Sequence, residues 1–148
     1  MNLFIDGFDE PNVNFPDKFL LETISGFSNA TFQLAQLSII RLDYSQRARS
    51  YLNTNFQFQV VLSSDYLKGY SFKVFEFGYD VTIYPVVVNL EETIGEELGL
   101  EADFDNCYTQ LCNDENDFKE TLRSIFASEH FKKTVGGLIK IAKSNTNT

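Results

Sequence analysis

Carboxylates are the side chains of this sequence most able to do chemistry, and they are concentrated in one segment. Eleven acidic residues lie between Glu91 and Glu120 with a single base, Lys119, whereas the other 118 residues hold ten acids and eleven bases. A field of one sign attracts a partner of opposite sign and speeds their encounter, by roughly tenfold to a thousandfold at low salt. The segment therefore predicts a surface that captures a basic partner.

Part of this acidity has a simpler structural explanation. Four of the eleven acids fall in the first turns of predicted helices, where the helix dipole favours negative charge by about 0.3–1 kcal/mol each. These four are Glu91, Glu92, Glu115 and Asp117. The other seven could form a solvated face that serves only solubility. We favour a binding role, because solubility alone would tolerate acids spread along the chain.

The predicted binding surface combines charge with an aromatic anchor. Interfaces gain most of their affinity from a few desolvated side chains, among which tyrosine is frequent, and charge around them steers the encounter. The predicted partner-binding residues are Glu96, Glu97, Glu101, Asp103, Asp105, Tyr108, Asp114 and Asp117.

A calcium-binding loop is a second use that these carboxylates could have. Asp103 and Asp105 match the first and third ligand positions of such a loop. Cys107 then takes the fifth ligand position, Tyr108 takes the place of the turn glycine, and Asp114 replaces the closing glutamate. Because three of the required positions fail, we predict no metal site here.

Catalytic groups are scarce in this chain. His130 is the only histidine, and the sequence contains no G-x-S-x-G, no Gly-rich phosphate loop and no H-E-x-x-H. A carboxylate pair such as Glu92 and Glu96 would need an apolar enclosure to separate its pKa values, which a short exposed helix lacks. Cys107 and Cys112 lack the further ligands of a zinc site, so we expect reduced thiols. We predict no catalytic residue, no metal and no cofactor.

The first part of the chain predicts one helix and two strands. Pro16 at a first helical position and Gly26 as a stop predict a helix over 15–25. The alternation over 31–42 slips in phase once, which favours a strand with a bulge. Residues 56–62 alternate apolar and polar side chains, as in a strand with one buried face.

Two further strands are predicted to form a hairpin. Residues 72–77 and 81–88 are rich in aromatic and β-branched side chains, and the glycine-containing segment 78–80 joins them. The sheet is therefore predicted to be antiparallel at this point. Pro85 has no N–H to donate, so it is expected at a bulge or on an edge strand.

A short helix is predicted directly after the hairpin. Asn89 is its predicted cap, Leu90 its first residue and Gly99 its end. At 100° per residue, Glu92 and Glu96 point away from the apolar stripe and toward solvent.

Two more helices are predicted near the end of the sequence. Asp114 caps a helix whose inner face carries Phe118 and Leu122, and Ser128 caps a second helix that reaches Ala142. A kink is expected at residues 136–137, which are both glycine. Residues 144–148 have nothing apolar to bury and are expected to form a disordered tail.

Length and composition predict one domain. With 43% hydrophobic and 22% charged residues, 148 residues are enough for a packed core. We expect a single α+β domain over 1–143, in which an antiparallel sheet is packed against helices from the N-terminal and C-terminal parts of the chain. A small basic patch is expected from Arg41, Arg47 and Arg49.

The overall charge and the first residues predict where the protein acts. A net charge of −9 argues against nucleic acid and anionic membranes as direct ligands. The sequence after Met1 lacks the basic and apolar regions of a secretory signal, and no apolar run is long enough to span a membrane. We therefore expect a cytoplasmic protein.

The stretch 75–90 reads FEFGYDVTIYPVVVNL and passes from strand to helix in a small acidic protein. In this stretch, in size and in acidity the chain resembles immunity proteins of bacterial contact-dependent growth inhibition systems and related polymorphic toxins. The resemblance implies a cognate toxin domain, often a DNase or RNase, bound one-to-one. Such a toxin would be neutralised by covering its active site or an adjacent surface.

Two other functions remain open at this point. An acidic nucleic-acid mimic or adaptor would inhibit several DNA-binding or RNA-binding proteins in a salt-sensitive way, whereas an immunity protein would bind one toxin tightly at moderate salt. A small enzyme would need a pocket in which titratable groups converge.

Overall fold

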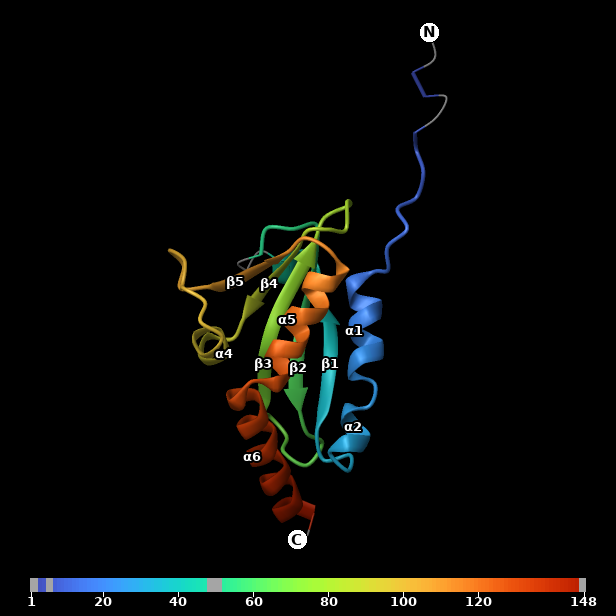
Figure 1. The fold of residues 1–148 in the computed structure, drawn as a ribbon. Helices are drawn as coiled ribbons and strands as arrows, with labels where there is room; N and C mark the ends of the chain where they lie inside the picture. The colour runs from blue at the N-terminus through green and yellow to red at the C-terminus, as the bar shows by residue number, and fades with distance from the viewer. Residues whose placement is uncertain (1–2, 5–6, 48–51, 147–148) are drawn as a thin grey trace.

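The strands form an antiparallel sheet in which each strand pairs with the next along the chain (Figure 1). The computed structural model of the protein describes residues 3–4, 7–47 and 52–146. Within this part the strands are β1 (Gln36–Arg41), β2 (Phe56–Ser63), β3 (Ser71–Tyr79), β4 (Val86–Leu90) and β5 (Tyr108–Cys112). The helices are α1 (Pro16–Ile24), α2 (Phe27–Ala30), α3 (Tyr44–Arg47), α4 (Glu92–Glu97), α5 (Glu115–Ala127) and α6 (Glu129–Thr146).

The core lies between the sheet and the helices that come from both ends of the sequence. On β2 and β3, the rings of Phe58 and Phe77 stack with their centroids 4.9 Å apart. The ring of Phe118 on α5 lies 5.7 Å from that of Phe77, and Leu20 on α1 is completely buried. The α+β class, the antiparallel sheet and its cover by helices from both parts of the chain are confirmed.

The predicted strand over 31–42 is shorter than expected. Residues Phe27–Ala30 form α2, and Phe32 and Gln33 follow with φ angles of 55° and 61°, so β1 begins only at Gln36. The predicted bulge in this segment is wrong, because β1 pairs with β2 in continuous register. The phase slip marks the turn after α2, and the bulge of the sheet lies in β3, where Val74 is the extra residue opposite Val60 and Val61.

The predicted hairpin has a longer connection than residues 78–80. Strand β3 continues to Tyr79 and β4 starts at Val86, so residues 80–85 join them. The predicted strand over 81–88 is therefore wrong in its first half. Pro85, which follows a cis peptide bond, lies just before β4 and neither at a bulge nor on an edge strand.

The predicted cap of the next helix is also wrong. Asn89 lies within β4, and Glu91 caps α4 by accepting a hydrogen bond from the backbone N–H of Ile94 at 2.9 Å. The structure confirms that Glu92 and Glu96 are exposed on α4.

The two long helices begin where the sequence predicts. Asp114 accepts a hydrogen bond from the N–H of Asp117 at 2.8 Å, and Ser128 accepts one from the N–H of Phe131 at 3.3 Å. Helix α6 passes through residues 136–137 and ends at Thr146, beyond the predicted start of the tail at Ser144. Residues 147–148 lie outside the described part of the chain.

The predicted basic patch can be followed only at Arg41. Its guanidinium lies 5.5 Å from the ring centroid of Phe56, in a cation–π contact. The side chain of Arg47 and all of Arg49 lie outside the described residues. Among the described helices, none has both the length and the apolar character needed to cross a membrane.

Candidate functional site

Helix α4 is held against the edge strand β5 by a close contact between Gly95 and Tyr108. The Tyr108 side chain is only 8% exposed, and its hydroxyl donates a hydrogen bond to Glu96 at 2.9 Å. This hydrogen bond is the main cause of the raised pKa of the Tyr108 phenol. The predicted role of Tyr108 as an anchor for a partner requires an accessible ring, but its side chain is a buried contact that fixes α4 and Glu96.

The segment between α4 and β5, residues 101–106, is an exposed loop that we call the acidic loop. Oδ1 of Asp103 accepts hydrogen bonds from the N–H groups of Asp105 and Cys107, both at 2.9 Å, so this carboxylate shapes the turn. Among the described residues, the carboxylates of Glu101 and Asp105 have no hydrogen-bond or ion-pair partner. Between them Phe104 is fully exposed. The acidic loop thus presents an aromatic ring flanked by two unpaired negative charges.

Other predicted contact residues serve the fold. Glu97, the last residue of α4, accepts hydrogen bonds from the N–H of Glu129 at 2.7 Å and of His130 at 3.0 Å. It therefore caps the start of α6 from another helix. Asp114 is the N-cap of its own helix α5, and Asp117 accepts a hydrogen bond from the N–H of Asn113, just before that helix, at 3.1 Å. These carboxylates satisfy helix ends, where unpaired N–H groups are costly.

The predicted contact residues do not form one patch. Glu96, Glu101, Asp103 and Asp105 gather at the start of β5, whereas Asp114 and Asp117 follow its end. A strand of five residues separates the two groups by roughly 17 Å. The first group, on α4 and the acidic loop, includes the two aspartates that flank the exposed Phe104 in the sequence.

Replacing Glu97 with alanine is expected to lower the free energy of unfolding by about 1–2 kcal/mol, because it leaves two N–H groups at the start of α6 without their acceptor. Urea unfolding followed by circular dichroism measures the change. Glu101→Ala is the matched control and should stay within about 0.5 kcal/mol of the unaltered protein, since its carboxylate has no partner in the described part. Equal effects of the two substitutions would contradict the capping role.

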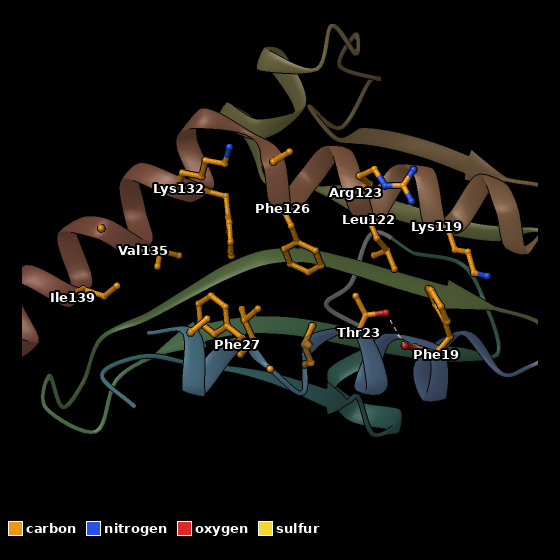
Figure 2. A pocket seen from close by; sticks show the side chains of 17 residues that line it. Phe19, Thr23, Phe27, Lys119, Leu122, Arg123, Phe126, Lys132, Val135 and Ile139 are labelled. Carbon is orange, nitrogen blue, oxygen red and sulfur yellow. Dashed lines mark hydrogen bonds between the residues drawn. The ribbon is translucent and has the colours of Figure 1, made fainter. Parts of the chain in front are cut away.

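A second surface feature is an apolar groove between the N-terminal helices and the long C-terminal ones (Figure 2). Helices α1 and α2 form one wall, α5 and α6 form the other, and Leu37 of β1 belongs to its lining. Its volume is about 890 Å³, which is large enough for a ligand or a peptide segment. The lining consists of Phe19, Thr23, Ile24, Gly26, Phe27, Ala30, Leu37, Lys119, Leu122, Arg123, Phe126, Ala127, Phe131, Lys132, Val135, Gly136 and Ile139.

The groove differs in charge from the rest of this acidic protein. Among the described residues that line it, three are bases and none is an acid. Lys119 lies 5.0 Å from the ring centroid of Phe19 across the groove, and it pairs with Glu115 at 4.0 Å. Arg123 pairs with Glu120 at 2.7 Å, whereas Lys132 has no ion-pair partner in the described part of the chain. We call Lys119, Arg123 and Lys132 the basic rim.

The side chains that could take part in nucleophilic chemistry include His130 and the thiols of Cys107 and Cys112. His130 Nε2 lies 3.8 Å from Glu91, and its ring packs edge-on against Phe72 at 5.8 Å. Burial raises the pKa of the Cys107 and Cys112 thiols, which disfavours the nucleophilic thiolate form. No group of three or more potential metal-binding side chains comes together within the described ranges.

Comparisons with protein-family models, with curated proteins and with solved structures give no match for this chain.

Two features of the site escaped the sequence analysis. The exposure of Phe104 could have been predicted, because an aromatic residue between two aspartates in a predicted loop is not expected to enter the core. The groove carries no such signal, since its walls come from helices about 100 residues apart in the sequence.

Proposed function

We propose that this protein is a cytoplasmic immunity protein, which binds a basic toxin domain one-to-one through α4 and the acidic loop. We expect this toxin to be a nuclease, because nucleases line their substrate sites with lysine and arginine. The observation that carries the proposal is the fully exposed ring of Phe104 between the unpaired carboxylates of Glu101 and Asp105. The resemblance to contact-dependent immunity proteins supports the same kind of partner.

The chemistry of the acidic loop suits rapid capture of a basic surface. Exposed carboxylates stay hydrated in the free protein, and their charge steers a positive partner from a distance. The ring can then enter a pocket of the partner and become the desolvated centre of the interface. Glu96 adds a third charge whose position is fixed by Tyr108.

The first experiment is bacterial growth during induction of a candidate toxin domain, taken from a gene that neighbours the one for this protein. Co-expression of the protein should restore growth against that domain and not against unrelated nuclease toxins. Growth arrest that the protein does not relieve would refute the immunity function. Protection against many unrelated nucleases would instead favour a nucleic-acid mimic. Such a mimic should also lose its binding to these nucleases at moderate salt in vitro.

Charge reversal at the loop tests the binding surface directly. The double variant Glu101→Lys and Asp105→Lys should associate with the toxin domain at least tenfold more slowly at low salt, because both unpaired carboxylates become repulsive. Stopped-flow fluorescence or surface plasmon resonance measures the association rate. The control, Glu22→Lys with Asp65→Lys, changes the net charge equally at exposed positions outside the loop. Equal slowing in both variants would mean that only net charge matters.

A further inference from the structure

The N-terminal arm, by which we mean the described residues 3–4 and 7–15, exposes more apolar surface than a polar tail would. Leu3, Phe4 and Phe8 are 68%, 73% and 74% exposed. Figure 1 shows the arm running away from the sheet and the helices. Large exposed apolar side chains that lie close together in a chain mark interaction sites in soluble proteins.

The apolar groove has the complementary character. Figure 2 shows Phe126 on one wall and Phe27 on the other with their rings turned into the groove. Phe27 of one wall lies 6.1 Å from Phe131 of the other, and Phe19 lies 6.5 Å from the buried core ring of Phe118. The groove therefore offers aromatic and aliphatic contacts to the rings of an entering segment.

The charges of the arm and the groove are opposite. From residue 3 to residue 15 the sequence carries three acids, Asp6, Asp9 and Glu10, and no base. The groove is bordered by the basic rim and, among its described lining residues, by no acid. Lys119 and Arg123 already pair with Glu115 and Glu120, so Lys132 is the base of the rim that can meet an acidic segment directly.

We propose that the groove binds the N-terminal arm of a second copy of this chain, so that two copies exchange arms around a twofold axis. Nine extended residues, 7–15, span roughly 30 Å, which matches the roughly 30 Å of helix between Lys119 and Ile139 on the longer wall of the groove. Each copy contributes its arm and the 17 residues that line its groove. That number is close to the roughly 20–30 residues per side of a standard interface.

The path of the arm explains why the occupant comes from another copy. Phe15 is extended, with φ −66° and ψ 132°, and Pro16 after it disfavours a helical turn at this position. Asn14 donates a hydrogen bond to Glu115 at the start of α5, at 3.4 Å. The chain is thereby directed away from its own groove and toward solvent, where a neighbouring molecule can receive it.

Sedimentation equilibrium of the full chain over a concentration series tests the proposal. We expect a monomer–dimer equilibrium that weakens at higher salt, because part of the contact is electrostatic. Phe4→Ser with Phe8→Ser should weaken dimerisation at least tenfold, and so should Lys132→Glu in the groove. Phe32→Ser, which removes a ring that is 79% exposed and lies outside both the arm and the groove, should leave it unchanged.

Mixing the two weakened variants distinguishes arm exchange from other dimers. The arm variant keeps an intact groove and the groove variant keeps an intact arm, so their mixture should form a heterodimer with one complete contact. A chain that stays monomeric at every concentration, or a dimer that ignores the arm substitutions, would overturn the proposal. The acidic loop belongs neither to the arm nor to the groove, so the arm variant should still protect growth if the proposed immunity function is right. The growth assay therefore tests the immunity function separately from dimerisation.

Discussion

Gly95→Ala is expected to destabilise the protein by about 3 kcal/mol, although alanine is the better helix former by roughly 1 kcal/mol. A Cβ atom on residue 95 would lie 2.4 Å from Cβ and 2.5 Å from Cγ of Tyr108. The Tyr108 Cβ is fixed to the backbone of β5, so no rotation of its side chain relieves the clash. Helix α4 must therefore move away from β5, and the hydrogen bond from Tyr108 to Glu96 is strained with it.

The matched control is Gly137→Ala in α6. A Cβ at this position meets nothing within 4 Å, so the substitution should stabilise the protein by about 0.5–1 kcal/mol through helix propensity alone. Thermal and urea unfolding of both variants measure the two signs. Destabilisation by both, or by neither, would show that the packing of α4 against β5 does not set the stability at Gly95.

Local signals explain which parts of the fold could be predicted from the sequence. Asp114 and Ser128 cap helices through contacts with residues three positions ahead, and the helix that begins at Pro16 follows from neighbouring residues. Such contacts depend on a few residues of chain and are visible as patterns. The first and last residues of β1 and β4 were harder to predict from the sequence, because strands are defined by pairing with distant partners.

The candidate site shows the same division. The excess of carboxylates was evident, but the role of Glu97 depends on the start of α6, more than 30 residues away. The burial of Tyr108 depends on the absence of a side chain at Gly95, which composition cannot reveal. Tertiary packing thus decides which acids cap helices and which, like Glu101 and Asp105, stay available for a partner.

If the acidic loop binds the proposed toxin domain, we expect Phe104→Ala to weaken that association by about 2 kcal/mol, or roughly thirtyfold in Kd. The ring is fully exposed in the free protein, so its removal should leave the free energy of unfolding unchanged within about 0.5 kcal/mol. Isothermal titration calorimetry measures the affinity, and urea unfolding checks the stability. Phe32→Ala is the matched control, because it removes another largely exposed ring outside the acidic loop.

Loss of the ring and reversal of the charges should affect different rate constants of binding. Loss of the Phe104 ring should act mainly on the dissociation rate, since a desolvated anchor holds a complex that has already formed. Reversal of Glu101 and Asp105 should act mainly on the association rate and should depend on salt. If Phe104→Ala and Phe32→Ala bind equally well, the ring is not the centre of the interface. A loop that binds by charge alone would then show the association effect without the dissociation effect.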